Sequence, residues 1–505
     1  IHEQIKKMNF LKELPVGNTL VGMYAKCGSL EDAQEIFENL LFRNVVSWTA
    51  LIGGYAEHGP FEEALRFFSQ MHEDGVSPND VSFACTLKAC GNLRAINKGH
   101  EIHANVVLTG SGSELLVGNS LIDMYARCGS LVEADYVFHK LDSRNIVSWT
   151  TLIGGYAEGG YGLDALRYFD QMKSEGVQGN AFTLACALKA CGSIGSIKRG
   201  QEIHFEIAQN GYDHDLSLAN TLIGMYAKCG SLTEAQDVFD DLQIHDVVSW
   251  SALASGYAEH GRAQDAVKCF EQMQLDGLSP NRVTFACVLK ACGSIGAIDK
   301  GHEVHLLVTK NGLEEDPHVV NSLIIMYARC CCLPEAQSVF RMLPVLDVVT
   351  WSSMIKGYAL NHEGEMAVQC FKDMKEHGIK PNSVTFTCLL TACSHTNLVV
   401  DGMNYFKSMR EEYKILPLPE HYACILTLLA RSGHLFEAER FLDSTCPLSK
   451  ETWVALLTAC KTHGEIELGF RCFQELAELD EQDGAAWYVL MAEMYANAGQ
   501  WEDVY

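Results

Sequence analysis

The sequence predicts an all-α protein, an α-solenoid of about fourteen antiparallel helical hairpins. Three observations predict this fold class: a period of 101 residues, a division of each period into pieces of 31, 35 and 35 residues, and two amphipathic runs around a central glycine in each piece. A lone hairpin leaves its apolar face in water, whereas stacked hairpins bury it. A repeated hairpin therefore favours a solenoid.

The period is defined by residues that return 101 positions later. They include Asn18, Asn119, Asn220 and Asn321, and also Trp48, Trp149, Trp250 and Trp351. We expect the tryptophans to pack between helices, and His103 and its copies to be interior or interface histidines. Cys85 and Cys90 are five residues apart, which places them about 140° apart on a helix, so they cannot hold one metal ion. We expect them and their copies to be small core residues.

Each piece predicts two helices. The runs 121–125 and 134–138 have apolar residues at helical spacing, and the glycine between them ends the first helix. Ser29, Ser130 and Ser231 are each followed three residues later by an acid, which predicts a capping box at the start of the second helix. Cys332 replaces this serine in the fourth copy, so we expect a weaker cap there.

Composition and charge exclude several classes of protein. The 505 residues are 48% hydrophobic, which is enough for a packed core and excludes disorder. A net charge of −26 argues against loose polybasic binding to nucleic acid or to an anionic membrane. No apolar run is long enough to predict a transmembrane helix. The 20 cysteines are too sparse for a disulfide scaffold and fit a reducing interior. The chain starts at Ile1 and stops within a helical pattern, so we expect that a transit peptide or a further domain can lie outside it.

The segments VVSWTALIGGYAEHG…EEALRFFSQMHEDGVSPN at 45–79 and FACTLKACGNLRAINKGHEIH at 83–103 resemble pentatricopeptide repeats. The alternation of short, standard and long repeats resembles the PLS subclass of plant organelle RNA-editing factors. The resemblance implies a right-handed α-solenoid with four parts. Residues 1–13 would end a long repeat, 14–382 would alternate the three repeat types, 383–450 would hold a terminal long and short repeat, and 451–505 would be extension motifs, the second one truncated.

The resemblance also implies that two residues of each short and standard repeat, the fifth and the last, read one RNA base. The short repeats supply Asn18 with Asn44, Asn119 with Asn145, Asn220 with Asp246, and Asn321 with Asp347; the standard repeats supply Thr49 with Asn79, Thr150 with Asn180, Ser251 with Asn281, and Ser352 with Asn382. By spacing alone, these residues are equally well explained as turn and cap residues at repeat joints.

Two further rows of residues are candidates for contact with RNA. Val46, Val147, Val248 and Val349 stand second in the standard repeats, where the resemblance implies that they wedge between bases; simple packing between repeats is the alternative. Lys26, Arg127, Lys228, Arg329 and Arg431 stand near the end of a first helix, close to phosphates in the family; a favourable cation at a helix C-terminus is the alternative. Glu57, Glu158 and Glu259 occupy the same place in the standard repeats, where we expect them to repel RNA.

The sequence therefore predicts a sequence-specific single-stranded RNA-binding protein that selects the site of C-to-U editing in a mitochondrion or chloroplast. We predict no catalytic residue, cofactor or metal site in this chain, and a DYW-type deaminase would act in cis or in trans. The long repeats have Ala84, Ala185 and Ala286 at the fifth position. They would separate the base-reading repeats from one another and offer a surface to accessory organellar editing proteins. The alternatives are an organelle RNA stability or processing factor and a protein-binding helical-repeat scaffold, which the charge of −26 favours.

Overall fold

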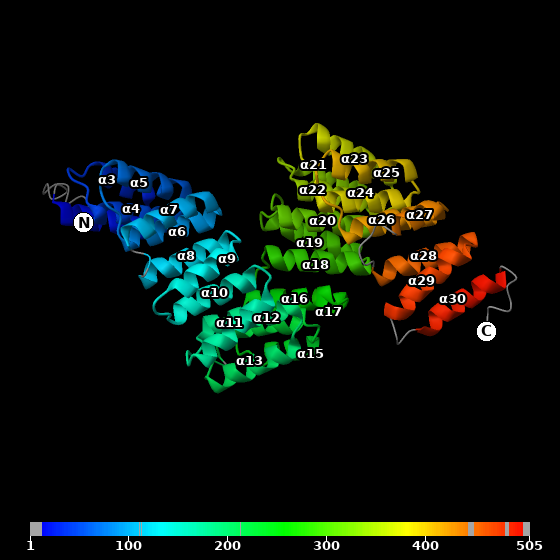
Figure 1. The fold of residues 1–505 in the computed structure, drawn as a ribbon, viewed down its shortest axis with the longest axis horizontal. Coiled ribbons are helices and arrows are strands. Elements are labelled where there is room, and N and C mark those ends of the chain that lie inside the picture. Colours follow the sequence, from blue (N-terminus) through cyan, green and yellow to red (C-terminus); the bar gives the residue numbers. More distant parts are fainter. Residues whose placement is uncertain are drawn as a thin grey trace. The chain divides into compact units, whose positions relative to one another are not determined.

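The computed structural model describes residues 13–110, 112, 114–212, 214–442, 449–479 and 484–497. Of the predicted end of a long repeat at 1–13, residues 1–12 lie outside these ranges, as do the last eight residues of the chain. The described elements are the helices α2 to α30, and no strand occurs among them (Figure 1). They form fourteen successive pairs, α2–α29, followed by α30 alone. The predicted all-α solenoid class of about fourteen hairpins is confirmed.

The chain divides into two compact units, residues 1–256 and 257–505, and each is described by itself. The first helices of the hairpins up to residue 256 are α2 (Leu14–Lys26), α4 (Val45–His58), α6 (Asp80–Leu93), α8 (Leu115–Arg127), α10 (Ile146–Glu158), α12 (Ala181–Ile194) and α14 (Leu216–Lys228). Their second helices are α3 (Leu30–Glu38), α5 (Phe61–Glu73), α7 (Ile96–Thr109), α9 (Leu131–Lys140), α11 (Gly162–Ser174), α13 (Ile197–Gln209) and α15 (Leu232–Asp240). Helix α16 (Val247–Glu259) contains the boundary between the units.

The second unit continues the alternation. Its further first helices are α18 (Arg282–Ile295), α20 (Pro317–Arg329), α22 (Val348–Leu360), α24 (Ser383–His395), α26 (Pro419–Arg431) and α28 (Lys450–His463). The second helices are α17 (Ala263–Leu275), α19 (Ile298–Lys310), α21 (Leu333–Met342), α23 (Gly364–Glu376), α25 (Val399–Glu411), α27 (Leu435–Leu442) and α29 (Ile466–Leu479), and α30 (Gly484–Asn497) follows. The short repeats are short because their second helices have only 8 to 10 residues, against 13 in the standard repeats.

First helices of successive hairpins pack on one another and form one layer within each unit, as α2 does on α4 and α4 on α6. Second helices pack on their own first helix and on the next one, as α3 does on α2 and α4. The close approach of α4 to α2 requires Gly54, because a Cβ at this position would lie 2.6 Å from the Cβ of Ala25. The first helices therefore present a continuous face on which their exposed residues line up.

The core confirms the packing residues expected from the sequence. Trp48 and its three copies are buried, and Trp48 packs edge-on against Phe37 with ring centroids 4.7 Å apart. The predicted core cysteines are buried except Cys85, which is partly exposed. His103 Nδ1 is hydrogen-bonded to Tyr125 Oη at 2.7 Å, between α7 and α8. Its copies His204 and His305 make the same bond to tyrosine.

The predicted capping boxes at the second helices are wrong. Ser29, Ser130 and Ser231 make no side-chain capping bond. In each turn the backbone N–H of the serine is hydrogen-bonded to a carbonyl group of the preceding helix. Ser29 N–H, for example, donates to Tyr24 C=O at 3.0 Å. The turn is thus closed by backbone hydrogen bonds of the Schellman type, which place the serine at ψ near 70° instead of in the extended region that a capping residue adopts.

In the described ranges, no helix combines the length and apolar composition that a bilayer crossing requires.

The turn of the fourth short repeat generates a testable prediction. Cys331 has φ 60°, at the place where Gly28, Gly129 and Gly230 have φ 78°, 79° and 80°. Because the left-handed region is strained for a residue with a Cβ, we expect Cys331→Gly to stabilise the second unit by about 0.5–1 kcal/mol. Urea unfolding followed by circular dichroism measures this change.

The matched control is the reverse exchange, Gly129→Cys, at a turn where an added Cβ would meet no atom within 4 Å. It should destabilise the first unit by a similar amount. Equal stability of Cys331→Gly and the parent chain would show that the turn tolerates the cysteine without strain.

Candidate functional site

The last residue of each short and standard repeat within 14–382 caps the first helix of the next hairpin. Asn79 Oδ1 accepts from Ser82 N–H at 2.9 Å, while Ser82 Oγ accepts from Asn79 N–H at 2.7 Å. The same residue accepts helix N–H groups at Asn44, Asn145, Asn180, Asp246, Asn281, Asp347 and Asn382. An Asn or Asp in this position satisfies N–H groups that the helix itself leaves unpaired. The cap interpretation of these residues is thus correct.

Capping uses only one of the two polar atoms on each side chain. The Oδ1 atom faces the helix, and in the described residues the other atom, Nδ2 of Asn or Oδ2 of Asp, has no hydrogen-bond partner. These side chains are exposed or half-buried. The cap therefore orients a free donor at each Asn and a free acceptor at each Asp.

The fifth residues of the short repeats reach toward the caps. Asn18 Nδ2 donates to Asn44 Oδ1, and Asn220 Nδ2 donates to Asp246 Oδ1, both at 3.2 Å. The structure records no such bond for Asn119 with Asn145 or for Asn321 with Asp347. The Oδ1 atoms of Asn119, Asn220 and Asn321 are buried without a partner.

The fifth residues of the standard repeats lie deeper. Thr49 is half-buried, and its Oγ1 donates to Asn79 Oδ1 at 3.4 Å. Thr150, Ser251 and Ser352 are buried, with exposures of 4 to 6%. Ser352 Oγ bonds Thr385 Oγ1 at 2.8 Å, which in turn donates to Asn382 Oδ1 at 3.0 Å. Thr150 bonds Thr183 in the same way. These two hydroxyls therefore contact the cap residue through a third side chain.

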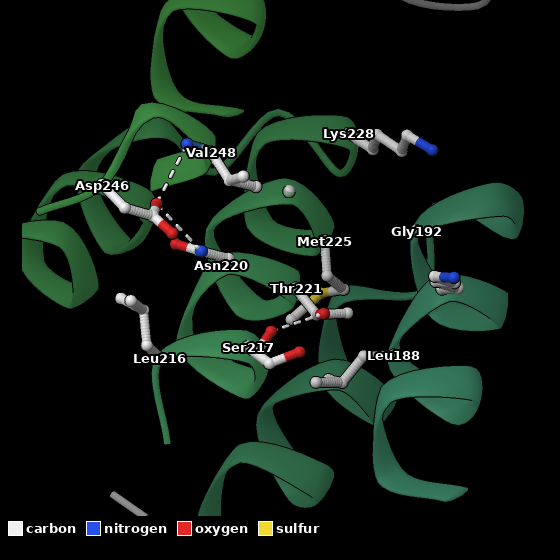
Figure 2. A pocket seen from close by; sticks show the side chains of 12 residues that line it. Leu188, Gly192, Leu216, Ser217, Asn220, Thr221, Met225, Lys228, Asp246 and Val248 are labelled. Carbon is white, nitrogen blue, oxygen red and sulfur yellow. Dashed lines mark hydrogen bonds between the residues drawn. The ribbon is translucent and has the colours of Figure 1, made fainter. Parts of the chain in front are cut away.

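A groove of about 580 Å³ surrounds the Asn220 and Asp246 pair (Figure 2). It is lined by α12, α14 and the start of α16, and Val248 and Lys228 lie on its wall. Burial alone would raise the pKa of Asp246, but hydrogen bonds from Ser249, Asn220 and Val248 outweigh it and leave the pKa below its ordinary value. At neutral pH this carboxylate is therefore ionised and can only accept hydrogen bonds.

A second groove, of about 780 Å³, surrounds the Thr49 and Asn79 pair between α2, α4 and α6. Val46 and Val81 both line it, and both are about half exposed. Cys85, the partly exposed cysteine, also lines this groove. Both grooves thus combine a capping residue with an apolar side chain on the first-helix layer, and each has a volume typical of small-ligand sites.

The second residue of each standard repeat is an exposed valine. Val46, Val147, Val248 and Val349 have exposures of 51 to 53%. An equivalent row, not predicted from the sequence, stands at the second position of the long repeats: Val81, Phe182, Val283 and Val384, with exposures of 47 to 67%. An apolar residue at a fixed second position could have revealed it, but exposure is not visible in the sequence.

The predicted cations Lys26, Arg127, Lys228, Arg329 and Arg431 are all exposed, and each lies in the last turn of a first helix. Arg127 is paired with Asp123 at 2.8 Å. The expected repulsion from Glu57 is weakened, because Lys88 Nζ donates to Glu57 Oε2 at 2.9 Å. This hydrogen bond lowers the pKa of Glu57 and keeps it paired as a carboxylate.

Within the described residues, no cluster of three or more His, Cys, Asp or Glu side chains could hold a metal ion.

Family models match most of the chain. The model described as PPR repeat family matches residues 43–92, 144–193, 245–294 and 346–395. The model of the PPR repeat matches 18–45, 119–146, 218–247, 318–348 and 384–413, and the model of the E motif matches 463–505. The E motif lies within the segment 451–505 for which extension motifs are predicted.

Curated relatives come from Arabidopsis thaliana. A pentatricopeptide repeat-containing protein is 34% identical over 504 residues, which cover 100% of this chain and 71% of the relative. The chloroplastic pentatricopeptide repeat-containing protein DOT4 is 37% identical over 506 residues, which cover 100% of this chain and 58% of the relative. A mitochondrial member is 35% identical, with 100% of this chain and 66% of the relative covered.

Among solved structures, the chain is similar to the pentatricopeptide repeat protein PPR10 in complex with an 18-nt psaJ RNA element. The TM-score is 0.57 at 18% identity, and the match covers 97% of this chain and 72% of that one. At this identity the likeness shows a shared fold.

Proposed function

Since this chain belongs to the pentatricopeptide repeat family, we propose that it is a sequence-specific single-stranded RNA-binding protein. One observation carries the proposal: a row of Asn and Asp side chains, each fixed by its helix cap, has one free polar atom turned away from the helix at every short and standard repeat within 14–382. PPR10, a protein with the same fold, is in complex with an RNA element. The chain spans 58 and 71% of two of its relatives, so the activity of the whole protein is part of this proposal.

The free polar atoms match the pairing edges of the bases. The Nδ2 donor of Asn suits the ring-nitrogen acceptor of cytosine or adenine. The Oδ2 acceptor of ionised Asp suits the ring N–H of uracil or guanine. We assign pyrimidines to repeats with Asn at the fifth position and purines to repeats with Thr or Ser there. The buried hydroxyls of Thr150 and Ser352 would act on the base through the cap residue that they position.

The exposed apolar rows supply the stacking surfaces of this proposal. The groove around Thr49 and Asn79 has Val46 on one helix and Val81 on the next, so a base seated there would lie between two apolar side chains. Such stacking is tolerant of base identity and adds affinity at each nucleotide. Specificity then comes from the caps.

We further propose that the chain selects a cytidine for C-to-U editing in a chloroplast or mitochondrion. The E motif at 463–505 and relatives named chloroplastic or mitochondrial support this assignment. Deamination would be carried out by a DYW-type domain in cis or in trans, and accessory editing proteins would bind the long repeats. A role in RNA stability or processing would use the same RNA-binding surface.

Selection of bound RNA from a random pool tests the proposal. The order of the repeats predicts the site Y-A-n-Y-A-n-U-A-n-U-A, read from the Asn18 repeat, where n is an unread position facing a long repeat. Selected RNAs that lack this three-nucleotide repeat would overturn the assignment of the base-reading residues. A chain that enriches no RNA would instead favour the protein-binding scaffold that the charge of −26 suggests.

The substitution Asn382→Asp should change the preferred base from A to G at the last position of the site. Asp retains the cap on α24, because its Oδ1 can accept from Thr385 N–H as Asn382 does at 2.9 Å. The free atom changes from a donor to an acceptor, and a good base contact discriminates by roughly 1–3 kcal/mol, so the affinity ratio should move about tenfold toward G. Fluorescence anisotropy with the two RNAs at fixed salt measures the ratio.

Asn79→Asp is the matched control, since it should shift preference at the second position of the site and leave the last position unchanged. If neither substitution moves its ratio, the caps are purely structural residues.

Phe182 is the one aromatic side chain in the described long-repeat row of Val81, Phe182, Val283 and Val384, and it is 67% exposed. We expect Phe182→Ala to weaken RNA binding by about 1–2 kcal/mol, because an aromatic face stacks on a base better than an alkyl group does. Val283→Ala, at the same repeat position, should cost less than half as much. Binding isotherms of both variants with the selected RNA measure the difference, and equal losses would argue against stacking at this row.

A further inference from the structure

An acid and a lysine recur together on the first helices. Glu57 with Lys88, Glu158 with Lys189, and Glu259 with Lys290 are each 31 residues apart and return at the 101-residue period. The acid belongs to a standard repeat and the lysine to the long repeat that follows. In the fourth period both change together, to Leu360 and Thr391.

The first couple forms an ion pair across two hairpins. Lys88 Nζ on α6 lies 2.9 Å from Glu57 Oε2 on α4, and the two side chains are 43 and 62% exposed. The structure records no ion pair between Lys189 and Glu158 of the second couple, although both charges act on the pKa of the Cys186 thiol, which the lysine lowers and the glutamate raises. Such exposed pairs contribute little to stability, about 0–1 kcal/mol, so the lysine is easily drawn to another anion.

These couples lie on the surface of the candidate site. Glu57 lines the groove of Thr49 and Asn79. Lys189 lines the groove of Asn220 and Asp246, whose wall also includes Lys228 (Figure 2). Lys189 thus belongs to a long repeat, which has alanine at the fifth position, but faces the same groove as a capping residue, and Lys88 is bonded to a glutamate that lines the other groove.

We propose that Lys88 contacts an RNA phosphate opposite its long repeat in exchange for its ion pair with Glu57, and that Lys189 and Lys290 make the equivalent contacts beside Glu158 and Glu259. This inference rests on the proposed RNA binding and assigns the long repeats a role in it. The long repeats would hold the RNA backbone at the nucleotide whose base is not recognised by any side chain. A lysine ammonium has three donors and can transfer from a carboxylate to a phosphate oxygen.

The acids then set the strength of binding without changing its specificity. Each carboxylate competes with a phosphate for one lysine, so it lowers affinity for every RNA alike. Discrimination between RNAs is left to the base contacts, which makes the −26 charge compatible with selective binding.

The test compares the salt dependence of binding in four proteins: the parent chain, the triple variant E57Q/E158Q/E259Q, the triple variant K88Q/K189Q/K290Q, and the variant with all six substitutions. The probe is the RNA selected by the parent chain. A phosphate contact on a single strand adds about 0.7 to the slope of log affinity against log salt. The slope of the glutamate variant should exceed that of the six-fold variant by about 2. Between 50 and 200 mM salt, the glutamate variant should then lose roughly 20-fold more affinity.

The six-fold variant has the same net charge as the parent chain, so a smaller slope than the parent's cannot come from overall charge. Thr391→Lys is a gain-of-contact control, because no acid stands at position 360, and it should raise the slope by about 0.7. Equal slopes in the glutamate and six-fold variants would overturn the inference while leaving RNA binding intact. A parent chain that shows no base preference would overturn the proposed function itself.

Discussion

The hydrogen bonds between the last side chain of a short or standard repeat within 14–382 and the first N–H groups of the next helix are the constraint on which the rest of the structure depends. They satisfy groups that would otherwise be unpaired at these joints. They also fix the direction of the amide or carboxylate, because only the acceptor atom can face a helix N-terminus. Under the proposed function, Asn79, Asn382 and Asp246 combine a structural and a recognition role in one side chain, with one polar atom for each.

The packing of the first helices turns these separate caps into a row. Gly54 lets α4 approach α2 closely, and Gly155 has the same role in the next period, where an added Cβ would lie 2.6 Å from the Cβ of Ala126. Successive first helices consequently meet in the same way, so their capping residues and exposed valines recur at equivalent places. The hydroxyls of Thr150 and Ser352 support this order from within the core, where each bonds a threonine that itself contacts a cap.

The hairpins and the tryptophan core could be predicted from the sequence, because helical periodicity and the 101-residue repeat are both local patterns. The caps of the second helices could not be, since Ser29 has the residue type of a cap but its backbone belongs to the preceding turn. The pairing of Lys88 with Glu57 depends on how α4 and α6 cross, which no spacing reveals. The burial of Thr150 and the exposure of Phe182 likewise depend on which side of each helix is covered by the neighbouring helices.

The shared ability of Asn and Asp to cap has a genetic consequence. Their codons, AAY and GAY, differ at a single nucleotide, so one transition mutation exchanges a free donor for a free acceptor at a joint such as Asn382. The exchange leaves the helix start satisfied, because either residue accepts its N–H groups. If the caps read bases as proposed, a lineage of such chains can therefore acquire new targets by point mutation, without first acquiring compensatory changes that restore folding.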